Sequence, residues 1–190
     1  QLQHLGERFH AIAFDLPGHG KSDSPSGASY SFPELAANLE VGISRLVGKE
    51  RIVLVGHSVG GMISSVYATP LELAKRLRGL VLISTHPKSR DAGDLEFMKG
   101  VERGEMKIMD RKLMEPINTY RWFTGGYAKE HKSLLKELFD QVYSTNEEVA
   151  LKITRNAIYD YDVEDKLEQI AVPTLIVTGD RDIAVPPRYS

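Results

Sequence analysis

The chain has 190 residues, of which 42% are apolar and 26% charged, a composition typical of one ordinary globular domain. Its formal net charge is only -2, with acidic and basic residues interspersed, which argues against a nucleic-acid partner and for a small, largely uncharged ligand. There is no cysteine, which excludes disulfides and thiolate metal sites, and no apolar run is as long as a membrane span. We expect a cytoplasmic protein, although the first residue is glutamine and a leader sequence stays open.

The first predicted elements are a strand and a helix. Residues 9–14 (FHAIAF) form a short apolar run that ends at Asp15 and a turn rich in proline and glycine, which predicts a buried strand leading into a loop. Ser31 and Glu34 have the spacing of a helix capping box, and apolar residues recur on one helical face from there to Gly48. We therefore predict an amphipathic helix that ends at this glycine. Its apolar face consists of Leu35, Leu39, Ile43, Leu46 and Val47.

Three further apolar runs predict strands, at residues 51–55, 79–84 and 174–178. Each consists largely of β-branched residues and leucine, as in strands that are buried on both faces of a parallel sheet. A helix is expected between the first and the second run, ending near Pro70. Such an alternation, joined by right-handed crossovers, predicts an α/β fold: a mostly parallel sheet with helices on both faces.

The interval 87–170 breaks this alternation because its patterns are helical. Apolar residues recur at helical spacing around Phe139, and again after Thr145 and Glu148, which have the spacing of a second capping box. We therefore predict a helical cap over residues 87–170, inserted into a core made of residues 1–86 and 171–190. The cap carries aromatic and methionine side chains that either line an apolar pocket or pack a helical core, namely Met106, Met109, Met114, Trp122, Phe123 and Tyr127.

The most informative motif is residues 56–60 (GHSVG), which fits G-x-S-x-G between a predicted strand and a predicted helix. A serine at the tip of such a tight turn has a strained backbone, and glycine two residues before and after avoids a clash with the neighbouring chain. Ser58 would then be a nucleophile above the sheet, while the free N–H of Val59 would stabilise an oxyanion. Gly61 would allow the helix to pack closely on the sheet. The alternative is a structural turn with an incidental serine, which the strand context and two further motifs disfavour.

No cofactor motif fits the chain. The dinucleotide fingerprint G-x-G-x-x-G is absent at both predicted strand ends. Residues 20–22 (GKS) imitate the end of a phosphate-binding loop, but Asp15 stands where that loop needs its first glycine. We therefore expect neither a cofactor nor a metal.

Three ordered motifs resemble the α/β-hydrolase family, in particular its serine-nucleophile, cap-bearing, esterase-like members. Residues 15–22 (DLPGHGKS) look like the family's D-x-P-G-H-G-x-S loop, about forty residues ahead of the nucleophile, and residues 56–61 look like its elbow. Residues 173–182 (PTLIVTGDRD), followed by Pro186, resemble the strand and turn that present the acid of a catalytic triad. The resemblance covers nearly the whole chain.

The resemblance assigns the triad acid. The family places this acid three residues after the turn glycine and four before a proline, which selects Asp182 and leaves Asp180 as the alternative. Both residues follow a strand's carboxyl end, where the loops of a parallel sheet converge on a site, although Asp and Gly also populate ordinary surface turns. The implied function is hydrolysis of carboxylic esters through an acyl-enzyme on Ser58, because relatives that form alkyl-ester intermediates have aspartate at the elbow.

Two family features lie outside this sequence. The catalytic histidine is expected after the acid, but eight residues follow Asp182 and none is histidine. Among the six histidines of the chain, His86 is the least implausible substitute because it follows a predicted strand. The first oxyanion donor of the family would precede Gln1. We therefore expect an internal fragment of a longer protein, with little or no esterase activity alone.

Other functions on the same scaffold stay open. A carbon-carbon bond hydrolase or an acyltransferase would use every residue quoted above, and a non-catalytic binding protein would lack a competent triad. The sequence indicates no oligomeric state.

Overall fold

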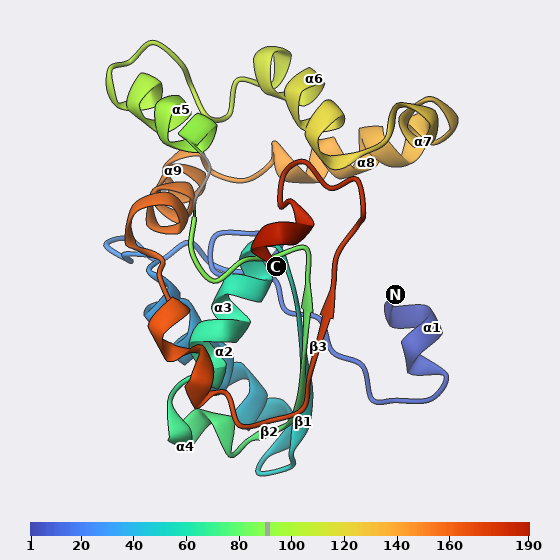
Figure 1. The fold of residues 1–190 in the computed structure, drawn as a ribbon, viewed down its shortest axis with the longest axis vertical. Coiled ribbons are helices and arrows are strands. Elements are labelled where there is room, and N and C mark those ends of the chain that lie inside the picture. Colours follow the sequence, from blue (N-terminus) through green and yellow to red (C-terminus); the bar gives the residue numbers. More distant parts are fainter. Residues whose placement is uncertain (90–91) are drawn as a thin grey trace.

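The sheet of the protein has three parallel strands in the order β1-β2-β3, seen nearly edge-on in Figure 1. The computed structural model describes residues 1–89 and 92–190. Helices occupy both connections between successive strands, so the α/β class predicted from the apolar runs is confirmed. The strands are β1 (Ile52–His57), β2 (Leu77–Ile83) and β3 (Thr174–Val177).

Helices cover one face of this sheet (Figure 1). α3 contacts β1 and β2, and α2 packs on α3. The side chains between these layers are fully buried, and each contributes roughly 1.5–3 kcal/mol through removal of apolar surface from water. They include Leu35, Ile63, Tyr67, Leu77 and Leu80. The helices are α2 (Phe32–Val47) and α3 (Val59–Ala68), followed by the short α4 (Leu71–Ala74).

The other face of the sheet is open to solvent in the described part of the chain, so the prediction of strands buried on both faces is wrong there. Val53 and Val55 of β1 are each 55% exposed, and Leu175 of β3 is 58% exposed. The short helix α1 (Leu2–Gly6) stands apart on this side and buries no residue (Figure 1). Continuous apolar content identifies a strand, but it does not reveal whether a helix covers each face.

Residues 9–14 do not form the predicted buried strand. The segment has no strand pairing, and Phe9 is 66% exposed. A strand needs a neighbour to take its backbone hydrogen bonds, and the outer edge of β1 has no partner within the described residues. Phe14 lies against α2 instead, where its ring would come within 2.7 Å of a Cβ at Gly42.

α2 and α3 begin and end close to where the sequence predicts. Ser31 caps α2 by accepting a hydrogen bond from the Glu34 amide at 3.4 Å, and Gly48 ends it with a φ of 60°. Leu35 and Ile43 of the predicted apolar face are buried, whereas Leu46 in the last turn is 57% exposed, which corrects the prediction at that position.

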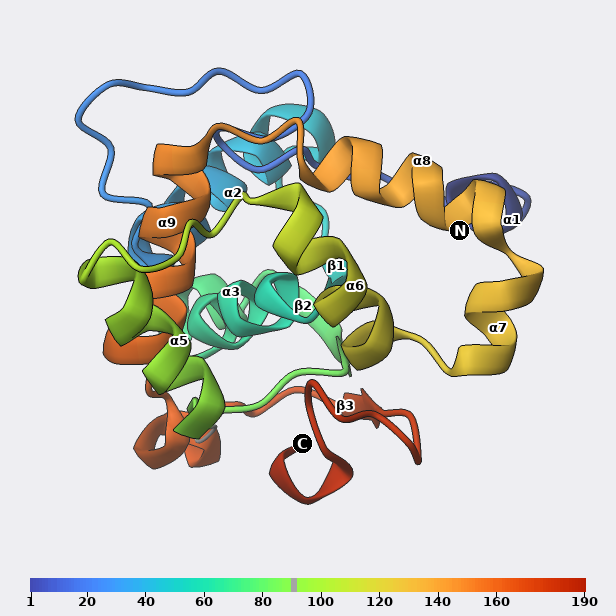
Figure 2. The same ribbon diagram turned by 90° about the horizontal axis from the view of Figure 1, so that it is seen from above.

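Helices α5 to α8 lie over the carboxyl ends of the strands, as the side view and the view from above both show (Figures 1 and 2). They occupy much of the predicted helical insertion. Leu135 and Phe139 on α8 are buried, and Trp122 at the end of α6 stacks on Phe139 at a ring-centroid distance of 5.8 Å. The bounds are α5 (Ala92–Glu102), α6 (Arg111–Trp122), α7 (Gly125–Glu130) and α8 (Lys132–Val142).

α9 (Glu147–Arg155) is capped by Asn146 and not, as predicted, by Thr145. The Asn146 Oδ1 accepts from the amide of Glu148 at 2.9 Å and from that of Val149 at 3.4 Å, because asparagine is the stronger capping residue. Buried residues of α9 belong to the same apolar cluster as those of α2 and α3. We therefore propose a cap of α5 to α8, with α9 returning to the core. The chain then passes through a π-helical turn (Asn156–Asp160) and two 3-10 turns (Glu164–Gln169 and Pro187–Tyr189) that flank β3.

Candidate active site

Ser58 lies at the tip of the turn from β1 to α3. Its φ of 51° and ψ of -121° are uncommon for a residue with a side chain, and such strain persists only where the surroundings hold it. The surroundings here are β2 and the segment after it. The Ser58 amide donates to the carbonyl of Ile83 at 2.9 Å, and the Thr85 hydroxyl donates to the Ser58 carbonyl at 3.0 Å. The strained turn that the motif predicts is therefore present and fixed on both sides.

Gly56 and Gly61 are required by close contacts. A Cβ on Gly56 would lie 2.4 Å from the carbonyl oxygen of Gly60, and one on Gly61 would lie 2.6 Å from Thr85 Cβ. The predicted steric roles of both glycines are thereby confirmed. The clash predicted for Gly60 is wrong, because a Cβ there would meet no described atom outside its own helical turn within 4 Å. The carbonyl oxygen of Gly60 is the atom that a Cβ on Gly56 would meet, whereas Gly60 has room for a Cβ of its own.

Gly56→Ala is expected to destabilise the fold by about 2–4 kcal/mol, because a backbone carbonyl cannot move away from the new methyl group. Gly60→Ala is the matched control in the same motif. It should change stability by less than about 1 kcal/mol, and in the stabilising direction, since alanine favours the helix in which residue 60 lies. Urea unfolding followed by circular dichroism measures both. Equal losses in the two variants would contradict the steric assignment.

The N-terminus of α3 offers a site for an anion beside Ser58. The amides of Val59 and Gly60 have no backbone acceptor among the described residues, as expected for the first turn of a helix. An oxyanion that forms on a carbonyl attached to Ser58 would meet these donors and the positive end of the helix dipole. Val59, the residue predicted to serve the oxyanion, is therefore in a suitable place.

The turn after β3 holds Asp182 in a fixed orientation. Its Oδ1 accepts hydrogen bonds from the amides of Ala184 at 3.0 Å and Val185 at 2.8 Å, so its other carboxylate oxygen stays available to a partner. Asp182 is half-buried, whereas Asp180 is exposed and has no comparable bonds among the described residues. This contrast favours Asp182 over Asp180 as the acid.

Ser58 and Asp182 follow the carboxyl ends of two strands that flank β2. His57 is in register with Ile83, and Ile83 with Val177. Neighbouring strands lie about 4.8 Å apart, so the ends of β1 and β3 are about 10 Å from each other. Ser58 and Asp182 lie beyond these strand ends, and the described structure contains no hydrogen bond between them. An imidazole placed between the two side chains would contact both.

The described histidines do not fill that position, since none is hydrogen-bonded to Ser58 or Asp182. His86 follows β2 but is largely buried, with its ring 6.3 Å from that of Tyr161. Its Nδ1 has no hydrogen-bond partner in the described structure. Burial lowers the pKa of its imidazole, and the nearby Asp94 carboxylate only partly opposes this effect. His86 is therefore a packed side chain whose surroundings disfavour the charged imidazolium.

The loop at residues 15–22 is closed by its own hydrogen bonds. Asp15 Oδ2 accepts from the Lys21 amide at 3.0 Å, and the Ser22 hydroxyl donates to the Asp15 carbonyl at 2.7 Å. Gly20 has a φ of 53°, and a Cβ there would lie 2.4 Å from Asp15 Cγ. The aspartate, glycine and serine of the motif thus shape the loop, and the structure assigns them no contact with Ser58.

A pocket of about 440 Å³ lies between the end of α6 and the turn after β3. Ser84 lines it, and this residue directly follows Ile83, to which the Ser58 amide is bonded. The pocket therefore reaches the end of β2, the strand next to the one that Ser58 follows. Asp182 also lines it. The sequence did not single out Ser84, although its place at the carboxyl end of the predicted strand 79–84 is the signal that would have found it.

Two of the six side chains proposed as pocket lining, Trp122 and Phe123, do line the pocket. Tyr127 instead stacks on the ring of His131 at 4.0 Å, and Met114 is buried in the cap. The pocket walls also contain residues that the sequence did not suggest as lining, among them Tyr120, Arg121, Thr124 and Arg181. Within the described ranges, no group of three histidine, aspartate or glutamate residues could hold a metal ion.

Comparison with known proteins agrees with this architecture. The family model of the alpha/beta hydrolase fold matches residues 1–190. The chain is 29% identical over 193 residues to a proline iminopeptidase of Saccharolobus solfataricus, a match that covers 90% of this chain and 60% of the relative. It is 27% identical over 194 residues to lipase 3 of a Moraxella species, covering 95% and 57%. The chain thus spans a little under two thirds of the length of these relatives.

Solved structures with the same fold include an enol-lactonase from Burkholderia xenovorans, with a TM-score of 0.83, 23% identity, and coverage of 100% of this chain and 69% of that one. A thermophilic esterase from Thermogutta terrifontis also gives a TM-score of 0.83 at 23% identity, covering 99% and 68%. The parallel sheet, the strained serine turn and the match along the full chain lead to one conclusion: this chain belongs to the α/β-hydrolase fold family.

Proposed function

We propose that the whole protein hydrolyses carboxylic esters through an acyl-enzyme on Ser58. The observation that carries this proposal is the strained backbone of Ser58 at the N-terminus of α3, beside the unpaired amide of Val59. Relatives of the chain are named as a lipase, a peptidase and an enol-lactonase, which supports acyl transfer to water as the reaction class.

In this mechanism the Ser58 hydroxyl attacks the ester carbonyl while a histidine removes its proton. The Val59 amide stabilises the oxyanion of the tetrahedral intermediate. The histidine then protonates the departing alcohol, and Asp182 orients the imidazole and stabilises its charge. Water, activated by the same histidine, attacks the acyl-enzyme and releases the acid. Apart from the histidine, each role falls on a residue at the carboxyl end of β1 or β3.

The substrate we propose is a small, largely uncharged ester with an apolar acyl chain. The aromatic rings of Trp122 and Phe123 supply a wall for such a chain, and the net charge of -2 gives no long-range attraction for a highly charged ligand. Among the described helices, none combines the length and the apolar composition that a membrane-spanning helix requires. A cytoplasmic location stays a prediction.

The 190 residues by themselves are expected to hydrolyse short para-nitrophenyl esters slowly or not at all, because no described histidine side chain is hydrogen-bonded to Ser58. Loss of a triad member typically costs about 10⁴ to 10⁶ in rate. A version extended at both ends, with a histidine after Asp182, should restore hydrolysis. Initial rates of both proteins at equal concentration test this expectation, and a fast 190-residue chain would overturn it.

Two readouts separate the alternative functions. A fluorophosphonate should modify Ser58 of the whole protein, as shown by the mass of the labelled peptide, whereas a binding protein without an activated serine would stay unlabelled. Product analysis with added alcohol distinguishes a hydrolase, which gives the free acid, from an acyltransferase, which gives a new ester. A carbon-carbon bond hydrolase would instead cleave a diketone and leave esters intact.

A further inference from the structure

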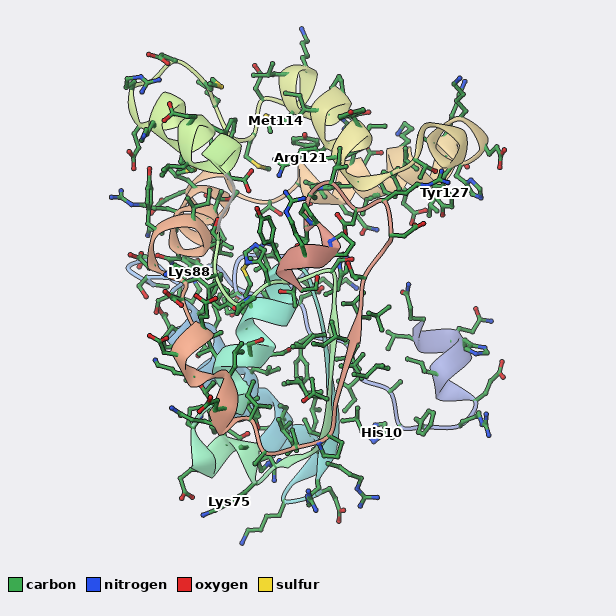
Figure 3. All side chains as sticks on the ribbon, viewed as in Figure 1. His10, Lys75, Lys88, Met114, Arg121 and Tyr127 are labelled. Carbon is green, nitrogen blue, oxygen red and sulfur yellow. The ribbon has the colours of Figure 1, made fainter. Side chains whose placement is uncertain are left out.

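The pocket beside Ser84 has an unequal distribution of charge. Asp180, Arg181 and Asp182 lie on the side of the turn after β3, where two carboxylates and one guanidinium give a net charge of -1. Arg121 is on the opposite side, in the last turn of α6. Figure 3 labels Arg121 below this helix, toward the segment that follows β3. The pocket is therefore acidic near the proposed triad acid and basic at the cap.

Arg121 is held in place by a second cap helix. Its Nη1 donates to Asp94 Oδ1 on α5 at 2.8 Å, and the two side chains are only 30% and 27% exposed. This bond uses one of the five N–H donors of the guanidinium group. Among the described residues, the other four donors have no acceptor. Arg121 thus presents a fixed and mostly unused set of donors to the pocket.

The space between Arg121 and the strand ends is walled by aromatic rings. Tyr120 and Trp122 flank the arginine in sequence and line the same pocket, with Phe123 next along the chain. A volume of about 440 Å³ is within the usual range for a small-molecule site. An acyl chain that starts at Ser58 would pass Ser84, lie along these rings and end at the guanidinium.

We propose that the natural acyl group ends in a carboxylate, and that Arg121 is the residue that selects it. This inference rests on the proposed ester hydrolysis, and it replaces the uncharged end of the acyl chain proposed above with one carboxylate, far from the reacting carbonyl. A planar carboxylate matches the fork of a guanidinium and can take two of its free donors at once. The carboxylates near the triad repel the same group, so the substrate enters with its reacting end toward Ser58. Asp94 acts through Arg121 as a positioning residue.

The test compares two esters in the whole protein. One is the para-nitrophenyl monoester of adipic acid, and the other is the matched ester in which an isopropyl group replaces the free carboxylate. We expect a higher kcat/KM for the acidic ester. Arg121→Gln should lower the ratio of the two kcat/KM values by about 10-fold to 100-fold, the usual effect of losing a hydrogen bond to a charged group. Arg121→Lys should lower it less, because charge remains while the fork is lost.

Two further variants separate selection from structural support. Asp94→Asn keeps the guanidinium but loosens it, so the ratio should fall less than in Arg121→Gln, mainly through KM of the acidic ester. Arg111→Gln removes an arginine from the other end of α6, where it pairs with Glu115 and Asp140, and should leave the ratio unchanged.

An unaltered ratio in Arg121→Gln, or an equal loss for both esters, would overturn the inference and leave ester hydrolysis intact. Absence of hydrolysis of either ester by the unmodified whole protein would instead count against the proposed function itself.

Discussion

Ser58→Ala is expected to lower the kcat of the whole protein for a short para-nitrophenyl ester by about 10⁴ to 10⁶. The methyl group cannot attack a carbonyl, so only binding and the oxyanion site would accelerate the reaction of water. Rates are measured at saturating ester, with the uncatalysed rate subtracted. Ser133→Ala, which changes an exposed serine on α8, serves as the control and should retain full activity.

Measurements of stability show whether Ser58→Ala loses activity through its chemistry or through unfolding. Alanine at position 58 keeps the positive φ and its strain, so the free energy of unfolding should stay close to that of the unmodified protein. Ser58→Gly should abolish activity equally while stabilising the fold by about 1 kcal/mol, because glycine adopts this conformation without strain. A Ser58→Ala protein that folds normally and keeps its rate would exclude Ser58 as the nucleophile.

Asp182→Asn is expected to reduce kcat by about 10⁴, since with its oxygen on the backbone amides the side chain would turn its NH2 donor toward the imidazole, which favours the wrong tautomer, and a neutral amide does not stabilise the imidazolium. The variant keeps the size of the side chain and an oxygen that can accept from the amides of Ala184 and Val185, so the turn should persist. Asp180→Asn is the matched comparison two residues away and should cost less than about tenfold, because that side chain is exposed. If Asp180→Asn proves the more damaging of the two, the acid is Asp180.

Local features of the candidate site could be predicted from the sequence because their causes are local. The strained turn at Ser58 follows the motif of residues 56–61, and the close contact that requires Gly56 is with Gly60, four residues later. The fixed orientation of Asp182 comes from amides two and three residues later. Contacts between residues that are close in the chain produce a fixed spacing of residue types, and this spacing can be recognised in the sequence.

Features that depend on residues far apart in the sequence could not be predicted, because such contacts leave no fixed spacing of residue types. The exposure of Val53 and Val55 depends on what covers the far face of the sheet, which an apolar run does not reveal. Arg121 joins the pocket because Asp94, 27 residues earlier on another helix, fixes it there. No spacing within α6 signals that contact. The failure of residues 9–14 to form a strand has the same origin, since a strand exists only with a neighbour.

The bare face of the sheet has a consequence for how these molecules behave in solution. An unpaired strand edge together with exposed valines and leucines is the kind of surface through which protein chains adhere to one another. Self-association of the 190-residue chain would bury Val53, Val55 and Leu175 without any change at Ser58. We therefore expect this chain to associate as its concentration rises, through a surface that does not include Ser58.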